Sequence, residues 1–275
     1  MKQSILITGA YGGMGNAAVA ALRNAGYRIF ALDRVSGEAC DGIVPIMADI
    51  TDENSLREAY KTVSNMTDSL FAIIHFAGIY MLDSLVEMET EAFEKIFKVN
   101  LEGAFLVNKT FLPMLSQGSR IIITTSELAP LAPLPFTGIY AVSKSALDKY
   151  AYSLRMELQL LGIEVSVIRA GAVNTGMLGV STDALRRFHN KTEIYTCNAE
   201  RFKNIVESVE AKSIEPEKLA KKIGRILEKK RPKFAYSINR NPLLLILHAL
   251  PHRMQFWIIK KVLENREENE NDKKR

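Results

Sequence analysis

Short apolar runs alternate with amphipathic stretches over the first two thirds of the chain, and this alternation constrains the fold more than any other feature. The apolar runs predict buried strands over residues 4–8, 27–32, 42–48, 71–77, 120–124 and 164–170. Apolar residues at helical spacing predict helices over 13–25, 53–65, 90–116 and 141–161. Strands that are apolar on both faces and alternate with helices indicate a parallel sheet covered on both sides. We therefore expect an α/β fold with a doubly wound parallel sheet.

One connection between strands is unusually short. Between Asp33 and Asp49 the chain offers only RVSGEACDGIVPIMA, which must also contain the next strand. This is too short for a crossover helix beside that strand, so we expect a bare loop or a single turn.

The pattern loosens after residue 176. Residues 176–213 are polar and mixed, and we expect helical excursions over the sheet edge that form a substrate loop. Residues 216–230 are typical of a helix beginning at Glu215-Pro216, and 233–238 of one more strand. The predicted organisation is one domain over 1–240, an apolar C-terminal extension over 241–263 and a disordered tail over 264–275.

Composition restricts the class of protein. The net charge of +5 is mild, and no basic face with a nucleic-acid-binding motif is visible. Cys40 and Cys197 lie far apart without the neighbours of a metal site, so neither a disulfide framework nor a metal centre is expected. No signal peptide is visible, and the apolar run 243–247 is far too short to span a bilayer. We expect a soluble cytoplasmic protein that binds no nucleic acid.

The first strand leads through TGAYGGMG, residues 8–15, into a helix. Gly9, Gly13 and Gly15 permit a tight turn and a close backbone approach to a pyrophosphate, which a helix N-terminus favours. Asp33, at the end of the second strand, is placed to bind the adenosine ribose and would repel a 2′-phosphate. NAD is therefore the preferred cofactor. NADP remains possible because the neighbouring Arg34 can hold that phosphate.

Eight motifs follow one another in the order TGAYGGMG, ALDR, ADIT, HFAG, KVNLEGAF, a serine after RIIITT, YAVSK and RAGAVNTGM. They extend from residue 3 to about residue 180, and with them the chain resembles the short-chain dehydrogenase/reductase family. The resemblance implies a Rossmann-type domain that binds NAD(P), oxidises an alcohol or reduces a carbonyl, and forms a homodimer or homotetramer. It also implies further cofactor contacts at Tyr11, Met14, Ile50, Ala77, Gly78, Asn100, Tyr140, Lys144, Val173 and Thr175.

Some positions within these motifs leave alternatives open. Asp49 is placed to hold the adenine amino group or to cap the helix over 53–65. Ala170 stands where the family usually has a proline, and His75 or Phe76 where an asparagine is often found. We interpret His75 as a structural residue at a strand end rather than as an acid–base group.

The resemblance places the family's catalytic groups on Asn100, Ser126, Tyr140 and Lys144. Tyr140 and Lys144 are four residues apart and share a helix face. The ammonium, together with the positive nicotinamide ring, would lower the phenol pKa and make Tyr140 a usable acid–base group. Ser126 would donate to the substrate oxygen, although Thr124 and Thr125 compete for this role and the Ser126–Tyr140 spacing is one residue longer than expected. Asn100 would hold a water that links Lys144 to solvent, or is a plain amide inside a helix.

The substrate is expected to contact Ser126, Leu128, Phe136, Tyr140 and Met177, because ligands in this fold bind outside the carboxyl ends of the strands. Apolar walls with a basic rim favour a hydrophobic alcohol or ketone that is steroid-, bile-acid- or retinoid-like. A 3-ketoacyl reductase of lipid metabolism is the alternative. A non-catalytic NAD-binding regulator is disfavoured, because both Tyr140 and Lys144 are present.

The apolar segment 242–263 has three possible roles. It resembles the C-terminal extension of the hydroxysteroid and retinol dehydrogenase branch, which indicates contact with a hydrophobic substrate. It could instead be a lid or a dimer contact. The order Phe256, Trp257, Ile258, Lys260, Lys261 also fits a helix lying on a membrane surface.

Overall fold

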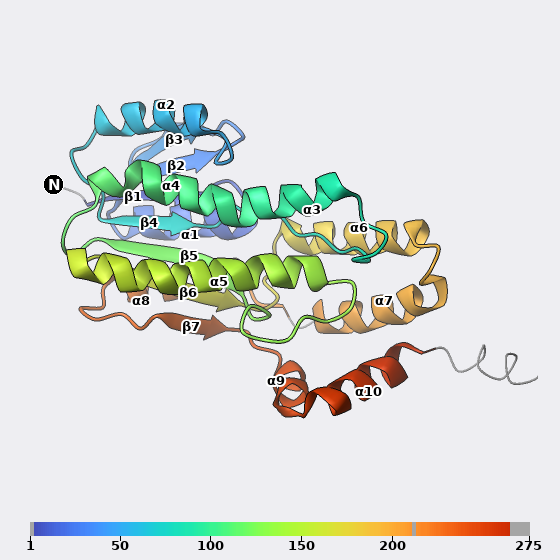
Figure 1. Ribbon diagram of the computed structural model, residues 1–275. Helices are drawn as coiled ribbons and strands as arrows, with labels where there is room; N and C mark the ends of the chain where they lie inside the picture. The colour runs from blue at the N-terminus through green and yellow to red at the C-terminus, as the bar shows by residue number, and fades with distance from the viewer. Residues whose placement is uncertain (1–2, 211–212, 265–275) are drawn as a thin grey trace, which may run out of the picture.

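A computed structural model describes residues 3–210 and 213–264 and confirms the doubly wound parallel sheet. Seven parallel strands lie in the order β3-β2-β1-β4-β5-β6-β7 (Figure 1). Their bounds are Ser4–Thr8 (β1), Arg28–Asp33 (β2), Ile43–Met47 (β3), Ala72–His75 (β4), Arg120–Ser126 (β5), Glu164–Ala170 (β6) and Ala235–Ile238 (β7).

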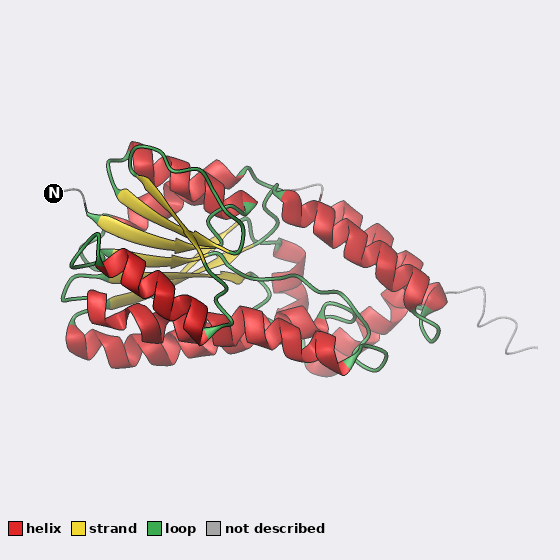
Figure 2. Ribbon diagram, turned by 90° about the horizontal axis from the view of Figure 1, so that it is seen from above, coloured by secondary structure: helices red, strands yellow, loops and turns green. Residues whose placement is uncertain are grey.

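Helices cover both faces of this sheet, as Figure 2 shows from above. The α-helices of the described residues are α1 (Gly13–Asn24), α2 (Glu53–Ser64), α3 (Thr90–Phe97), α4 (Gly103–Phe111), α5 (Gly138–Leu158), α6 (Gly176–Lys191), α7 (Thr196–Glu210), α8 (Pro216–Leu227), α9 (Pro242–Ala249) and α10 (His252–Leu263). Leu6 and Ile73 pack into one buried cluster with α2, α4 and α5, whereas Ile7 and Ile74 pack into a second with α1 and α8. The alternating side chains of each strand therefore explain why the strands are apolar throughout.

Two sequence expectations about connections had different outcomes. No helix intervenes between β2 and β3, as predicted. The single helix expected over 90–116 is wrong in detail, because α3 and α4 are separated by a π-helical turn, η1 (Lys98–Glu102), and α4 ends in a 3-10 turn, η2 (Leu112–Met114). Asn100 lies in the π-helical turn and bonds to another loop, and such turns frequently mark functional positions.

The region predicted as helical excursions consists of α6 and α7, which lie beyond the carboxyl ends of the strands (Figure 1). These helices have an apolar cluster of their own, separate from the two clusters of the sheet. Its buried members are Leu82, Phe136, Ala184, Leu185, Phe188, Ala199 and Phe202. The substrate side of the molecule thus has a small core that the sheet does not supply.

The C-terminal extension is not one continuous segment. α9 ends at Ala249 and α10 begins at His252, with Pro251 between them as the N-cap of α10. Proline restricts the residue before it to extended backbone and cannot continue a helix. No helix in residues 3–210 and 213–264 is long and apolar enough to cross a membrane. The predicted disordered tail lies, from residue 265 onward, outside the described residues.

Candidate active site

Three of the predicted catalytic residues meet where β5 ends and α5 begins. Ser126 is the last residue of β5, Tyr140 lies in the first turn of α5, and Lys144 follows one turn later. Ser126 and Tyr140 share a side-chain hydrogen bond. The Lys144 Nζ lies 5.9 Å from the centre of the Tyr140 ring and donates to the Thr124 carbonyl at 3.4 Å. The loop 127–137 therefore reverses the direction of the chain and places the end of β5 next to the first turn of α5.

The neighbouring hydroxyl groups have different surroundings. Thr125 Oγ1 donates to Asp148 Oδ1 over 3.3 Å. The same carboxylate accepts two hydrogen bonds from Arg169, from Nε over 3.0 Å and from the guanidinium Nη2 over 2.8 Å. The Thr125 hydroxyl is thus hydrogen-bonded to the Asp148–Arg169 ion pair, on the α5 side of β5. The structure places Ser126, rather than Thr125, beside Tyr140.

Burial dominates the acid–base properties of the pair. It raises the pKa of Tyr140 well above 10, and the nearby Tyr80 raises it further, while the hydrogen bond with Ser126 lowers it. Burial also lowers the pKa of Lys144 to about 8. The expected lowering of the Tyr140 pKa by Lys144 is therefore not produced by the chain's own groups. A buried phenol keeps its proton because the phenolate would be poorly solvated.

Asn100 connects the π-helical turn to the loop after β4. Its Oδ1 accepts from the Ile79 amide at 2.8 Å, and its Nδ2 donates to the Ile79 carbonyl and to Ser143 Oγ, both at 3.0 Å. A Cβ on Gly78 would lie 3.1 Å from Asn100 Oδ1 and 3.2 Å from Lys144 Nζ. Asn100 is thus a buried amide that fixes the loop next to Lys144.

His75 is part of a buried polar network, in agreement with its structural interpretation. Its Nε2 lies 2.9 Å from Asn108 Oδ1, and Asn108 Nδ2 donates to the Tyr150 hydroxyl at 3.1 Å. Burial, and to a lesser extent the charge of Lys144, lowers the pKa of His75 to about 4. His75 is therefore neutral at pH 7, and its ring nitrogen is engaged by the protein.

The glycine turn brings three loops together. Gly9 has a φ of +66°, and a Cβ there would lie 2.5 Å from the amide nitrogen of Ala77. A Cβ on Gly13 would lie 2.5 Å from the Thr175 Cβ, and one on Gly15 would overlap the Gly9 carbonyl oxygen. Only glycine fits at these close approaches. Residues predicted to contact the cofactor, from the ends of β1, β4 and β6, are therefore neighbours.

Asp33 and Asp49 both use their carboxylates locally. Asp33 Oδ2 accepts from the Tyr11 amide at 3.0 Å, and its Oδ1 accepts from the Arg34 amide at 2.7 Å. Asp49 Oδ1 accepts from the amide and hydroxyl of Thr51, both at 2.8 Å. Burial acts to raise the pKa of Asp49, but these bonds and nearby positive charges outweigh it and lower the pKa.

The alternative role of Asp49 as the cap of α2 is wrong, because Asp52 holds that position and accepts from the Asn54 amide at 2.9 Å. The remaining predicted cofactor residues line the same end of the sheet. Ile50 is buried against Gly103, Val173 is buried and pairs with Ile214, and Met14 packs at the edge of the α1–α8 core.

The predicted substrate residues have separate locations. Leu128 is half-buried, and its amide donates to Ser126 Oγ at 3.2 Å. Phe136 is buried in the α6–α7 cluster, with its ring centre 4.6 Å from that of Phe188, so it supports the wall rather than forming an open surface. Its φ of +64° belongs to the tight turn before α5. Met177 lies outside the side chains that the structure describes.

Sequence reasoning missed two residues of this region. Tyr80 lies after Gly78, and its ring centre is 4.8 Å from that of Tyr140. Glu127 is buried beside Ser126, and its Oε2 accepts from the Asn241 amide at 2.6 Å. The aromatic residue after HFAG was a visible signal for Tyr80. Nothing local marked Glu127, because its partner is more than a hundred residues away in the chain.

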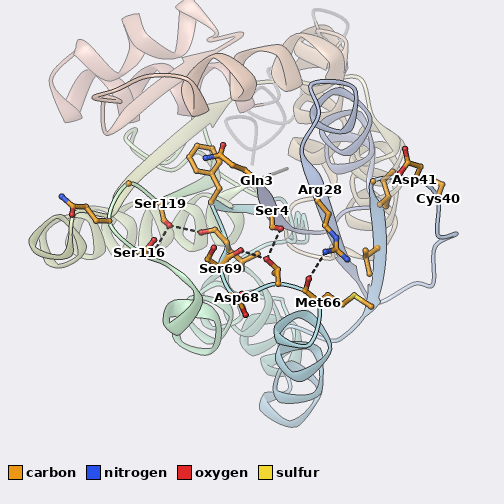
Figure 3. A pocket seen from close by; sticks show the side chains of 18 residues that line it. Gln3, Ser4, Arg28, Cys40, Asp41, Met66, Asp68, Ser69, Ser116 and Ser119 are labelled. Atoms are coloured by element: carbon orange, nitrogen blue, oxygen red, sulfur yellow. Dashed lines mark hydrogen bonds between the residues drawn. The ribbon is translucent and has the colours of Figure 1, made fainter. Parts of the chain in front are cut away.

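A broad hollow lies at the opposite end of the sheet (Figure 3). It has a volume of about 1010 Å³ and is lined mainly by the amino ends of strands and the loops before them. Several of its polar groups bond within the protein: Ser4 Oγ to Thr67 Oγ1 at 3.3 Å, Arg28 to the Met66 carbonyl at 2.8 Å, and Ser119 Oγ to the Leu70 carbonyl at 2.9 Å. Ligands of doubly wound sheets bind at the carboxyl ends, so this hollow is not the candidate site.

A family model described as short chain dehydrogenase matches residues 3–185. The chain belongs to the short-chain dehydrogenase/reductase family. It is an oxidoreductase of this family, whose members act on CH–OH groups with NAD(P).

Among curated proteins, the chain is similar to an NADPH-dependent 1-acyldihydroxyacetone phosphate reductase of Schizosaccharomyces pombe. The two are 32% identical over 66% of this chain and 65% of that protein, so the match leaves about a third of that protein uncovered. A 3-ketodihydrosphingosine reductase of Bacteroides thetaiotaomicron is 26% identical over 94% of this chain and 97% of that protein.

Among solved structures, a short-chain dehydrogenase from Streptomyces avermitilis superposes with a TM-score of 0.76. It covers 95% of this chain and 97% of that chain at 17% identity, and so it supports the fold alone.

Proposed function

We propose that this short-chain dehydrogenase reduces a ketone to a secondary alcohol, and catalyses the reverse, on a large hydrophobic substrate. The observation that carries the proposal is the hydrogen-bonded pair of Ser126 and Tyr140, with buried Lys144 one turn along the same helix. The pair lies at the carboxyl ends of the strands, as does the glycine turn. The close approaches at Gly9, Gly13 and Gly15 leave backbone groups accessible to a pyrophosphate, so the residues present fit NAD(P).

When bound, a nicotinamide cofactor would supply the hydride in reduction and accept it in oxidation. Tyr140 donates its hydroxyl proton to the carbonyl oxygen in reduction, so that the product is a neutral alcohol. Ser126 donates a hydrogen bond to the same oxygen and stabilises the charge that develops there. The raised pKa of Tyr140 keeps the phenol protonated at pH 7, which supports the direction of reduction.

Lys144 assists the same reaction by placing a positive charge near Tyr140. Its ammonium lies in the buried space between Gly78 and the Thr124 carbonyl, where it favours reprotonation of Tyr140 and is expected to bond the nicotinamide ribose. Asn100 holds the backbone of the Ile79 loop in place beside Lys144 through two hydrogen bonds to Ile79. A water path from Lys144 past this residue is part of the proposal.

NAD remains the proposed cofactor. The Asp33 carboxylate is fixed next to the glycine turn by the Tyr11 amide, and a negative charge there repels a 2′-phosphate. The glycine turn itself carries no basic residue. Arg34 and the NADPH-dependent relative favour NADP instead. The proposed preference for NAD therefore rests on the Asp33 carboxylate.

For the substrate, a ketone on a long-chain lipid is favoured by the names of both curated relatives, which describe reductases of ketolipids. A steroid-, bile-acid- or retinoid-like substrate is the second class, and the half-buried Leu128 and the ring of Tyr80 beside Tyr140 are side chains suited to contact either. The non-catalytic regulator is disfavoured, because the Ser126–Tyr140 pair is hydrogen-bonded and Lys144 is in place.

A homodimer through the outer face of α3, α4 and α5 is the proposed assembly. This face has a hollow of about 1080 Å³ and exposes Phe93 and Phe105. Its lining combines aromatic side chains with charged ones such as Glu94, Lys98 and Glu102. Exposed aromatic side chains ringed by polar groups are typical of contacts between protein chains. Sedimentation equilibrium that gives only a monomer would contradict the assembly.

The activity is tested by following NADH and NADPH consumption with a ketolipid, steroid ketones and a short-chain ketone. Tyr140→Phe is expected to lower kcat by about 10²- to 10⁴-fold, because it removes the proton donor, while cofactor binding measured by fluorescence is retained. Tyr152→Phe is the matched control on an exposed position of the same helix and should leave turnover unchanged. Turnover in Tyr140→Phe equal to wild type would refute the mechanism.

A further inference from the structure

The helices α9 and α10 expose more apolar surface than a helix pair of a closed domain does. No residue of α9 is buried, although the helix contains five consecutive leucine and isoleucine residues. Leu243 is 67% exposed and Ile246 is 61% exposed, while on α10 Phe256 is 71% and Trp257 63% exposed. Figure 1 shows the pair apart from the helices that cover the sheet. Leu244, Leu245 and Leu247 are half-buried, so the exposed apolar surface of α9 is formed by Leu243 and Ile246. Exposed apolar side chains gathered in one place are typical of a surface that binds a partner.

The pair is nevertheless held in a defined position. The Asn241 amide at the start of α9 donates to Glu127, and His248 Nδ1 accepts from the Ala132 amide at 3.3 Å. Gln255 Nε2 donates to the Leu250 carbonyl at 2.7 Å and ties α10 back to the end of α9. These contacts fix the exposed apolar face in relation to the loop that links Ser126 to Tyr140.

α10 is also attached to α7. Asn198 Nδ2 donates to the Leu263 carbonyl at 2.7 Å, and Arg201 donates to the Glu264 carbonyl. The apolar face is therefore a fixed feature next to the substrate side of the molecule.

Charge identifies the kind of partner. Residues 240–263 contain Arg240, Arg253, Lys260 and Lys261 and no acidic residue. Lys260 and Lys261 share one carboxylate, that of Glu264, at 3.2 Å and 3.5 Å, so the surface keeps a net positive charge. Each lysine lies one helical turn after an exposed aromatic residue, Phe256 or Trp257. Aromatic residues with neighbouring lysines are suited to the boundary between lipid headgroups and acyl chains.

A second copy of the chain would bring together two surfaces that each carry Arg240, Arg253, Lys260 and Lys261, and the Glu264 carboxylate at the end of each α10 offsets only part of this charge. An anionic lipid surface would attract them, since positive side chains near such a surface gain favourable electrostatic energy. We propose that α9 and α10 bind peripherally to an anionic membrane, with Leu243, Ile246, Phe256 and Trp257 at the headgroup–acyl boundary. The loop 127–137 then lies close to the lipid, so that an apolar substrate enters the site from the bilayer.

Trp257 is the only tryptophan in the chain and reports directly on this contact. With vesicles of phosphatidylcholine and phosphatidylglycerol, its emission is expected to shift to shorter wavelength and to be quenched by brominated phosphatidylcholine. Phe256→Ser retains the reporter and should weaken vesicle binding about ten-fold or more, because it removes a large apolar side chain from the lipid. Lys260→Gln with Lys261→Gln should weaken binding to anionic vesicles by roughly ten-fold and have little effect on neutral ones.

Leu160→Ser is the matched control, because Leu160 is 84% exposed and lies just before β6, at the opposite end of the sheet. It should leave vesicle binding unchanged, and circular dichroism checks the folding of each variant. An emission unchanged by vesicles overturns the proposal, as does an equal loss in Leu160→Ser. A dimer that Phe256→Ser converts to a monomer, without vesicle binding, assigns the surface to a second copy instead. The assay uses no substrate or cofactor, so its result is independent of the proposed activity.

Discussion

The glycine turn between β1 and α1 and the helix pair α9–α10 present opposite kinds of surface. At the turn, a Cβ on Gly9, Gly13 or Gly15 would collide with another part of the chain, so the backbone itself forms the surface. In α9 no side chain is buried, and the apolar surface faces outward. Backbone N–H groups can bind the phosphates of a cofactor without any side chain, and a tightly packed turn holds those groups in fixed positions. An apolar substrate or a lipid surface has to be met by side chains that the fold leaves uncovered.

After Tyr140→Phe, the largest effect is expected for Lys144→Met, because Lys144 is buried with its Nζ 5.9 Å from the centre of the Tyr140 ring. Turnover should fall by about 10²-fold or more, since Tyr140 loses its charged neighbour. The free energy of unfolding of Lys144→Met should not fall along with its turnover. Burial lowers the pKa of Lys144 to about 8, so the unfolded chain holds this proton more tightly than the folded protein does.

The sign of the pH dependence follows from this difference. Below about pH 8 both states are protonated, and the burial of the charge destabilises the folded protein. As the pH rises from about 8 toward 10.5, the ordinary pKa of a lysine side chain, the folded state releases the proton first and the free energy of unfolding increases. Urea unfolding between pH 7 and 10 should show this slope in wild type and not in Lys144→Met. The exposed Lys149→Met is the control, and an identical slope in both lysine variants would contradict the prediction.

Two glycine substitutions compare a position where a Cβ would collide with the backbone, Gly15, with a position where it would meet no other atom, Gly224. Gly15→Ala should destabilise the protein by about 1–3 kcal/mol, because the added methyl overlaps the Gly9 carbonyl. Gly224→Ala in α8 meets no atom within 4 Å and should raise stability by up to about 1 kcal/mol. Urea midpoints measure both changes. Equal midpoints for the two variants would show that the turn is not closed by backbone contact.

The smallest expected effect concerns cofactor choice. Asp33→Ala should weaken NADH binding by about ten-fold, the scale of one hydrogen bond to a charged group, and should leave NADPH binding equal or stronger. Fluorescence titration with both cofactors measures the change, and Asp41→Ala in the same β2–β3 loop is the control. Weaker NADPH binding with unchanged NADH binding would reverse the proposed preference.

Much of this architecture was accessible from local patterns. The strand positions, the missing helix between β2 and β3 and the glycine turn follow from residue periodicity and backbone freedom over a few neighbouring residues. The Tyr140–Lys144 pair was assigned through the resemblance to the family, and helix spacing places the two side chains on one face. The C-terminal extension was identified as apolar, but its division at Pro251 and its exposure required the structure.

Residues whose roles depend on distant partners could not be assigned in this way. Asn100, in the π-helical turn, forms hydrogen bonds with Ile79 and Ser143, which lie in other parts of the chain. Phe136 is buried only because α6 and α7 pack against it. The pKa of Tyr140 was expected to be lowered by a charge one turn away, but desolvation by the surrounding fold raises it and the nearby Tyr80 adds to the rise.

The sequence by itself determined the doubly wound sheet and the location of the glycine turn, because each depends on the order of residue types along a short stretch. The candidate catalytic residues came from the resemblance to the family and stay a prediction. Only the tertiary structure decided that Ser126 rather than Thr125 faces Tyr140, that Glu127 holds the start of α9, and that α9 and α10 remain uncovered. These features depend on which distant segments come into contact. Contact and burial are properties of the packed chain, and periodicity along the sequence does not specify them.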